Sequence, residues 1–334
     1  MRQSKLGLAT GLGLALLSYA ALVGWARRTL VRDRPPAELE AALQAWLGEA
    51  GLHGRSRYFH TRVGRVHVLL AGHSGSPVLL LPGLASSAGD FAELLAQLAR
   101  HHRVAAIDLP GGGLSDPVSF GGHPRQAWSE VVSAVADQLG VRQFDLVGHS
   151  LGGLAAGGFA IANPERVSRL VLISPLGFSR RIPLLWSFAR IPGALDLRGL
   201  HERWLLTHGA RRLPDRLERA DRENPDSAWG RYRLLVGRRQ GHASDLDLIG
   251  RLLQPFGLRP ESQLLPALGL LADRTLVLWG DRDRHLPLRD AEPEIRYYRD
   301  FQLEVVPGEG HLLPVLEPLL TARLITDFLE PSES

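Results

Sequence analysis

Short apolar strands alternate with helices along the chain, and this alternation constrains the fold more than any other feature. Hydrophobic runs typical of buried strands are separated by helical patterns between residues 78 and 173. Alternation of this kind produces right-handed crossovers, so the strands lie parallel in one sheet with helices on both faces. The expected strands are 78–81, 104–107, 144–147 and 170–173, and the expected helices are 90–99, 126–139 and 152–162.

Further strands are expected on either side of this region. Two short β segments, 58–61 and 65–70, are joined by Val63-Gly64 and predict a hairpin that leads into the first buried strand. Later in the chain the strand pattern resumes at 275–279 and again at 302–306. The predicted sheet is therefore mostly parallel, with an antiparallel hairpin before it.

An insertion interrupts the alternation between residues 179 and 272, where helical pieces rich in arginine are broken by proline. So long an insertion into a resumed parallel sheet predicts a helical cap over the carboxyl edge, where α/β folds bind ligands. The core is then divided into residues 58–178 and 273–334. Trp186 and Trp204 are candidates to line a substrate pocket in the cap, although they could equally pack the cap itself.

The N-terminal region, residues 1–34, contains an uncharged apolar segment at 6–26 with a basic flank. At about 1.5 Å per residue this segment could cross a hydrocarbon core of about 30 Å, which predicts a membrane anchor. Basic residues after the segment slightly favour a body on the cytoplasmic side. A cleaved signal peptide is the alternative, because Ser18-Tyr19-Ala20 could serve as a cleavage site. Cleavage after Ala20 would leave a secreted or periplasmic protein. A connecting helix is expected within residues 35–57.

Composition excludes several kinds of chemistry. The chain has no cysteine, so thiolate nucleophiles, disulfides and cysteine metal sites are absent. Its net charge of +4 is not accompanied by any nucleic-acid-binding signature, and no nucleic-acid partner is expected. The sequence also lacks a metal cluster, a phosphate loop and a dinucleotide fingerprint, so we expect neither a metal nor a cofactor. No obligate protein partner is evident.

The motif G-x-S-x-G at residues 148–152 places Ser150 between a predicted strand and a predicted helix. That context is typical of a nucleophile elbow, whereas the alternative is a hydroxyl in a glycine-rich turn. A serine hydroxyl is a poor nucleophile until a base takes its proton. A histidine and an orienting carboxylate must therefore follow later in the chain.

Five motifs, taken in this order, resemble the α/β-hydrolase superfamily. They are residues 81–84, 108–115, 148–153, 280–283 with Pro287, and Gly310-His311. The resemblance implies the α/β-hydrolase fold with a helical cap, Ser150 as nucleophile, His311 as base and Asp283 as the carboxylate that orients the imidazole. Asp281 is the rival carboxylate, but the family spacing G-x-x-D selects Asp283.

The same resemblance implies an oxyanion hole made by the backbone N–H groups of Leu84 and Leu151. This chain has Pro82-Gly83 where many relatives have His-Gly. The donor itself is the backbone N–H of Leu84, so an oxyanion hole is still expected with this sequence. Its exact shape does not follow from the motif.

A serine nucleophile implies acyl transfer, and hydrolysis of carboxylic esters is the first expectation. A basic cap beside an anchor suggests lipid-like substrates, and the whole set resembles membrane-anchored monoacylglycerol-lipase-like serine hydrolases. A cofactor-free acyltransferase, a perhydrolase or a C–C bond hydrolase would use the same three residues. A non-catalytic membrane interaction protein on the same fold is the remaining alternative.

Overall fold

A computed structural model describes most of the chain outside the first 35 residues and the predicted cap. The described residues are 36–84, 86–118, 120–181, 232, 248, 251–254 and 257–330. Eight strands form the central sheet, and in chain order they are β1 (Arg55–Thr61), β2 (Gly64–Ala71), β3 (Pro77–Leu81), β4 (Arg103–Ile107), β5 (Phe144–His149), β6 (Val167–Ile173), β9 (Thr275–Gly280) and β10 (Gln302–Val306).

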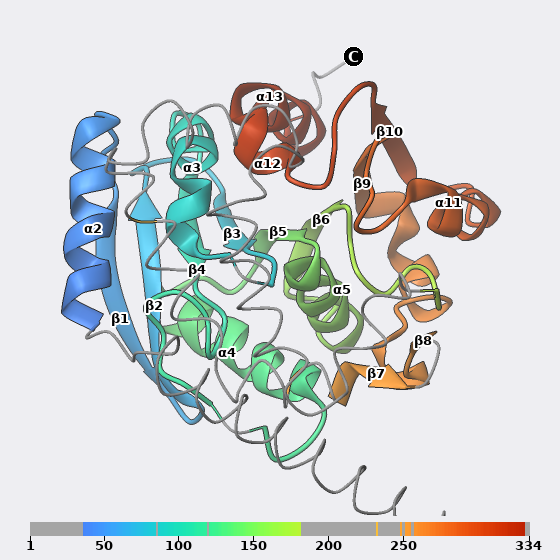
Figure 1. Ribbon diagram of the computed structural model, residues 1–334, viewed down its shortest axis with the longest axis horizontal. Helices are drawn as coiled ribbons and strands as arrows, with labels where there is room; N and C mark the ends of the chain where they lie inside the picture. The colour runs from blue at the N-terminus through green and yellow to red at the C-terminus, as the bar shows by residue number, and fades with distance from the viewer. Residues whose placement is uncertain are drawn as a thin grey trace, which may run out of the picture.

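Across the sheet the strands follow the order β1-β2-β4-β3-β5-β6-β9-β10 (Figure 1). The pairs β1–β2 and β2–β4 are antiparallel, and every other neighbouring pair is parallel. This arrangement confirms the α/β-hydrolase fold that the sequence predicted. The hairpin also forms as expected, with Thr61 paired to Gly64.

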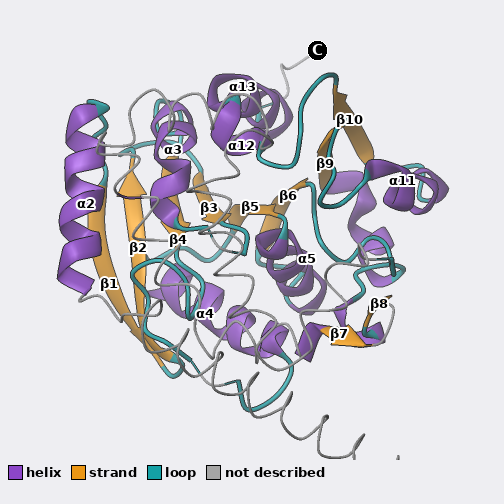
Figure 2. Cartoon of the chain, in the orientation of Figure 1, coloured by secondary structure: helices purple, strands orange, loops and turns teal. Residues whose placement is uncertain are grey.

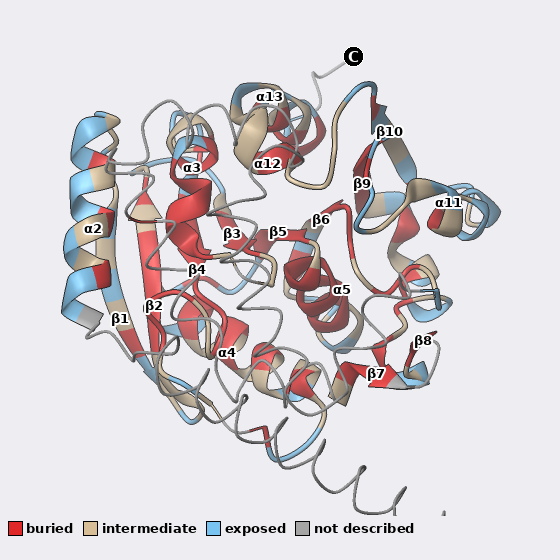
Figure 3. Cartoon of the chain, viewed as in Figure 1, coloured by how far each residue is buried: buried red, intermediate tan, exposed pale blue. Residues whose placement is uncertain are grey.

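Burial explains why the central strands have continuous apolar sequences. Every residue of β5 and β9 is buried, because both faces of the sheet are covered there (Figure 3). The edge strand β1 instead alternates exposed and partly covered residues, with Phe59 alone fully buried. A strand at the edge keeps one face accessible to solvent, so its sequence carries polar residues at alternate positions.

Helices cover both faces of the sheet (Figure 2). One hydrophobic cluster contains buried residues of α4 (Pro124–Gln138), α5 (Leu151–Ala162) and α11 (Leu288–Tyr297). The other contains buried residues of α2 (Pro36–Glu49), α3 (Ala92–Leu98) and α13 (Pro318–Leu329), with α12 (Leu313–Leu316) just before α13. The sheet thus separates two cores, as in the predicted layered architecture.

The first core helix differs from the prediction at its start. The expected helix 90–99 is divided into a 3-10 turn, η1 (Ala88–Phe91), and α3. Ser87 precedes the turn, and its backbone N–H donates to the Asp90 carboxylate at 2.8 Å. This capping box tightens the first turn and begins the helical segment two residues earlier than the apolar pattern indicated.

The predicted connecting helix corresponds to α2 and packs on the body of the protein. Leu39, Leu43 and Leu47 recur every four residues and are buried. Trp46 donates its indole N–H to the carbonyl of Gly89 at 3.2 Å, which ties α2 to η1.

The predicted cap, residues 179–272, is described only in part. Its described part contains a two-stranded hairpin, β7 (Leu253–Gln254) with β8 (Gly257–Leu258), followed by the 3-10 helices η3 (Pro260–Ser262) and η4 (Ala267–Arg274). The hairpin was not expected, because strands of two residues carry no detectable alternation. Trp186 and Trp204 lie outside the described residues, and the cap boundaries remain a prediction.

The predicted localisation has to be corrected. Within the described part of the chain, no helix is both long enough and apolar enough to cross a membrane. The segment 6–26, on which the anchor and its orientation rested, lies outside the described residues. The prediction of a membrane-anchored protein is therefore withdrawn.

Candidate active site

Ser150 lies in the sharp turn between β5 and α5. Its backbone has φ 54° and ψ −115°, a left-handed conformation that is unusual for a residue with a side chain. The start of α5 lies close to the end of β3, and this approach requires a glycine. A Cβ on Gly152 would lie 2.1 Å from the carbonyl oxygen of Leu81. The predicted strand–turn–helix context of this serine is therefore present.

The imidazole of His311 connects this serine to a carboxylate. Its Nε2 lies 2.9 Å from the Ser150 Oγ, and its Nδ1 lies 2.7 Å from the Asp283 Oδ2. A carboxylate can only accept, so a neutral His311 carries its proton on Nδ1 and leaves Nε2 free to accept the serine proton. The structure thus brings together the three residues that the sequence motifs selected.

The two neighbouring carboxylates have different partners. Asp283 is buried, and its other oxygen, Oδ1, accepts the backbone N–H groups of His285 and Leu286, each at 2.8 Å. Asp281 is exposed and accepts the backbone N–H of Gly308 at 2.7 Å. Of the two, Asp283 is the one that is hydrogen-bonded to His311.

The environment of Asp283 favours its ionised form. Burial by itself raises the pKa of this carboxyl. The hydrogen bond and charge of His311, together with the two backbone N–H groups, outweigh burial and hold the pKa below its usual value. An ionised Asp283 is suited to hold the Nδ1–H tautomer of the imidazole and to stabilise an imidazolium.

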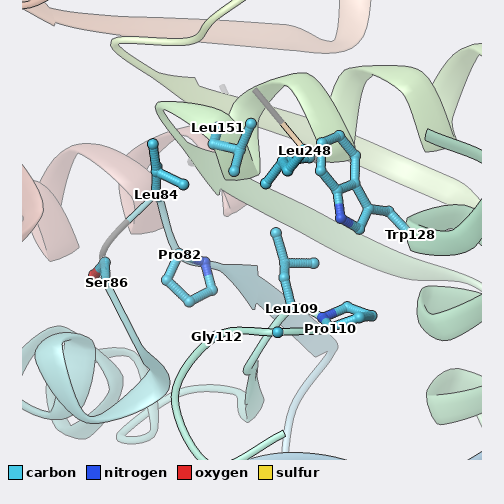
Figure 4. A pocket seen from close by; sticks show the side chains of 11 residues that line it. Pro82, Leu84, Ser86, Leu109, Pro110, Gly112, Trp128, Leu151 and Leu248 are labelled. Carbon is cyan, nitrogen blue, oxygen red and sulfur yellow. The ribbon is translucent and has the colours of Figure 1, made fainter. Parts of the chain in front are cut away.

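A small, open pocket lies next to the turn that follows β5, and Leu84 and Leu151 both line it (Figure 4). The structure therefore places the two predicted oxyanion residues at one cavity. The other lining residues come from the loops after β3 and β4, from α4 and from the cap: Pro82, Gly83, Ser86, Leu109, Pro110, Gly111, Gly112, Trp128 and Leu248.

The sequence motifs contain most of this lining, but they gave no indication of Trp128 or Leu248. Trp128 is buried within α4 and had only been assigned to a helix, and Leu248 is one of many apolar residues in the cap. Nothing in the local sequence distinguishes either residue from ordinary core packing. The loop 109–112 did carry a usable signal, because it follows the carboxyl end of a buried strand.

A buried aspartate holds the pocket loops in place. Asp108 accepts the backbone N–H groups of Ala88 at 2.6 Å and Leu114 at 2.8 Å, and it contacts the Nδ1 of His67 at 2.8 Å. These bonds join the segment after Leu84 to the segment after Leu109. The geometry agrees with a bracing role for Asp108.

Within the described residues, no group of three or more histidine and acidic side chains could hold a metal ion. The reactive group that the geometry does identify is Ser150. Its hydroxyl, hydrogen-bonded to an oriented imidazole, can attack an electrophilic carbon held beside the pocket.

Comparisons with known proteins agree with this architecture. Residues 76–318 match the family model described as alpha/beta hydrolase fold. A 2-hydroxy-6-oxononadienedioate/2-hydroxy-6-oxononatrienedioate hydrolase of Cupriavidus pinatubonensis is 27% identical over 287 residues, which cover 83% of this chain and 96% of that protein.

Two solved structures illustrate the likeness of the fold. Carboxylesterase CesB of Bacillus subtilis has a TM-score of 0.66 and 23% identity, covering 88% of this chain and 98% of that chain. A membrane phospholipase A that is a bacterial virulence factor has a TM-score of 0.61 and 24% identity, covering 99% of this chain and 98% of that chain. None of these three proteins is a monoacylglycerol lipase, so the finer resemblance expected from the sequence is not supported.

Proposed function

Because the chain belongs to the α/β-hydrolase family, we propose that it is a serine hydrolase that forms an acyl-enzyme on Ser150. The observation that carries this proposal is the continuous series of hydrogen bonds from Ser150 through His311 to Asp283. The strained turn at Ser150 supports it further, because a sharp elbow exposes the hydroxyl at the edge of the sheet.

In the first step, the Ser150 Oγ attacks the substrate carbonyl carbon while the Nε2 of His311 takes the hydroxyl proton. Asp283 stabilises the imidazolium that forms. Backbone N–H groups donate hydrogen bonds to the negatively charged carbonyl oxygen, and Leu84 and Leu151 are the candidates. Each such donor typically stabilises the transition state by about 2.7 to 4 kcal/mol. The imidazolium then gives its proton to the leaving group, and the acyl group remains on Ser150.

Water completes the cycle. His311 takes a proton from a water molecule, whose oxygen attacks the acyl carbon and displaces the Ser150 Oγ. The imidazolium returns a proton to the serine oxygen, so the enzyme is restored and a carboxylic acid leaves.

The position of the pocket supports a proposal for where the two halves of the substrate lie. The described pocket lining includes Leu84 and Leu151 but no residue of the loops that carry Asp283 and His311. The leaving group must be near His311 to receive its proton. The acyl group therefore occupies the pocket, and the leaving group lies on the His311 side.

For the bond that is cleaved, we favour a carboxylic ester with an apolar acyl group. The described side chains that line the pocket include no cation, and most are apolar. A dioate substrate such as that of the Cupriavidus relative carries two carboxylates, and a carboxylate buried in this pocket would find no cationic partner among the described lining residues.

Cleavage of a C–C bond is the second candidate. At the level of sequence, the matched relatives agree better with this alternative than with ester hydrolysis, since the Cupriavidus hydrolase is matched over most of both chains. The same serine, histidine and aspartate would serve, with a carbanion rather than an alkoxide as the leaving group.

Labelling and two substrate classes test the proposal. The wild-type protein should react covalently with a fluorophosphonate, and Ser150→Ala should abolish both the labelling and all hydrolysis. Ser174→Ala is the matched control, because Ser174 also has a positive φ, of 42°, and should leave labelling intact. Labelling that persists in Ser150→Ala would contradict the assignment.

The bond class is decided by comparing p-nitrophenyl esters with a 2-hydroxy-6-oxo-dienoate on the same preparation. Ester turnover that exceeds dienoate turnover supports the ester proposal. Preference for the dienoate would replace it with the C–C bond candidate while leaving the role of Ser150 intact.

A further inference from the structure

His149, the residue before Ser150, contacts the loop that carries His311, and the proposed mechanism does not use this contact. His149 ends β5 and is 2% exposed. Its Nε2 lies 2.8 Å from the backbone carbonyl oxygen of His311, and the centres of the two rings are 4.9 Å apart. One side chain therefore joins the nucleophile turn directly to the backbone of the residue that activates it.

The direction of this hydrogen bond can be assigned. A carbonyl oxygen only accepts, so the Nε2 of His149 carries the proton and donates it. Burial lowers the pKa of His149 to about 3, so the ring is neutral and its Nδ1 bears no proton. Among the described residues, that Nδ1 is buried without a hydrogen-bond partner. Within this part of the chain, the ring therefore forms its hydrogen bond through Nε2 alone.

The surroundings are shaped to accept this ring. A Cβ on Gly83 would lie 3.2 Å from the His149 Nδ1 and 3.1 Å from the Ser150 Cβ, closer than most such contacts. The glycine that precedes the oxyanion residue Leu84 therefore leaves room for the imidazole beside the nucleophile.

The backbone of the loop that carries His311 is held by few contacts within the loop itself. It contains Gly308 and Gly310, which hold the backbone weakly. Its earlier part is held by Asp281, which accepts the N–H of Gly308, and by the N–H of Arg282, which donates to the carbonyl of Glu309 at 2.9 Å. At His311 itself, within the described residues, the bond from His149 holds the backbone rather than the ring.

We propose that His149 is a positioning residue, whose Nε2–H fixes the backbone of His311 so that the imidazole meets Ser150 and Asp283 at once. This inference rests on the proposed serine hydrolase function. The three bonds of His311 act at different atoms: Asp283 and Ser150 orient the ring, and His149 places its backbone. A catalytic group displaced by about 1 Å can lose about a hundredfold in rate, so a single buried donor has a large effect here.

Three substitutions at one position test the donor itself. His149→Gln carries an N–H at a reach similar to that of the imidazole Nε2, whereas His149→Asn is one methylene shorter and places its amide near the vacant Nδ1 position. His149→Phe fills the space without a donor. We expect kcat on a p-nitrophenyl ester to fall about 10- to 100-fold in the Asn and Phe variants, with KM within about threefold of wild type. The Gln variant should stay within about threefold in both parameters.

Rates of fluorophosphonate labelling should follow kcat across the series, because the same base activates the serine in both reactions. Melting temperatures are measured in parallel. If the Phe variant does not fold, the Gln and Asn variants, which differ only in reach, still decide the question.

The inference is overturned if the Phe variant keeps wild-type kcat, or if the Gln variant falls as far as Asn. Either result would show that the imidazole acts only by packing. A wild-type protein that neither labels nor hydrolyses the ester would instead refute the proposed function, so the two failures are distinguishable.

Discussion

Asp283 and Asp145 are almost equally buried, with 5% and 6% of their surface exposed, but they lie at opposite ends of the sheet. Asp283 follows the carboxyl end of β9, in the candidate active site. Asp145 is the second residue of β5, near its amino end. The pKa of the first carboxyl is lowered from its usual value, and that of the second is raised to about 6.

The number of hydrogen-bond donors explains this difference. The chain turns back after Asp283, so two backbone N–H groups and the His311 ring all donate to its carboxylate. Asp145 lies within β5, at a point where the register between β5 and β6 is irregular, and its carboxyl accepts one backbone N–H, that of Arg169 in β6. Its main side-chain donor is the hydroxyl of Ser76, at 3.2 Å, and burial prevails.

The comparison shows that burial alone does not decide whether an aspartate is ionised. At the carboxyl edge of the sheet, a loop aims two backbone N–H groups at Asp283, and the His311 ring adds a third donor. Within the strand, Asp145 receives one backbone N–H, from Arg169, and the hydroxyl of Ser76, and these do not outweigh burial. A carboxylate that must stay charged during catalysis is therefore more readily built at that edge.

The largest effect should come from removing the charge of Asp283. Asp283→Asn removes the acceptor that selects the Nδ1–H tautomer of His311, and kcat should fall by about 10⁴-fold. Asp281→Asn is the matched control and should stay within about threefold, because its carboxylate contacts a backbone N–H and not the imidazole. Steady-state kinetics on a p-nitrophenyl ester would check both variants. A large loss in Asp281→Asn would reverse the assignment of the two carboxylates.

Asp145→Asn should leave kcat near wild type but change how stability depends on pH. In the folded wild type the pKa of Asp145 is about 6, above its usual value of 3.8, so folding stability falls as pH rises between these values. The asparagine variant lacks this loss. Its free energy of unfolding relative to wild type should therefore rise by about 2 kcal/mol between pH 4 and pH 8.

Urea unfolding at several pH values would measure how the difference in unfolding free energy between variant and wild type changes with pH. A pH-independent effect of the new amide on stability does not alter this change. Asp283→Asn should show the opposite trend, because the ionised form of Asp283 stabilises the folded protein and that stabilisation is lost as pH falls. If both variants shifted in the same direction with pH, the contrast between the two carboxyl groups would not hold.

The smallest effect is expected from Ser76→Ala. The Ser76 hydroxyl donates to the ionised Asp145 carboxylate, and Ser76 itself is exposed. Its loss should raise the pKa of Asp145 further and cost about 1 kcal/mol at pH 8, with less effect at pH 4 where Asp145 is protonated. Ser76→Thr keeps the hydroxyl and serves as control. Equal losses at both pH values would show that the hydroxyl does not act through the charge.

Much of the fold was predictable because its signals are local. The strands and helices from residue 55 to 173 follow from runs of apolar residues whose spacing reflects burial on two faces or on one. Ser150 could be selected because glycine spacing and the strand-to-helix change occur within a few residues of it. The start of α3 was misplaced, because the capping contact of Ser87 with Asp90 carries less weight than the apolar pattern.

Other features depended on segments that are distant in the sequence. Asp281 and Asp283 are two residues apart, and the sequence separated them only by family spacing, whereas the structure separates them by what each contacts. Trp128 lines the pocket because α4 packs beneath the loop after β4, and no local pattern encodes that.

The sequence by itself determined the layered α/β architecture and the site of the sharp turn at Ser150, since hydrophobic periodicity and glycine spacing act over a few residues. Only the tertiary structure decided which side chains meet at that turn. His149 lies beside Ser150 in the sequence, yet its role follows from a carbonyl 162 residues away. Contacts of this kind arise when the sheet brings the carboxyl ends of separate strands to one edge, and their partners cannot be read from either segment alone.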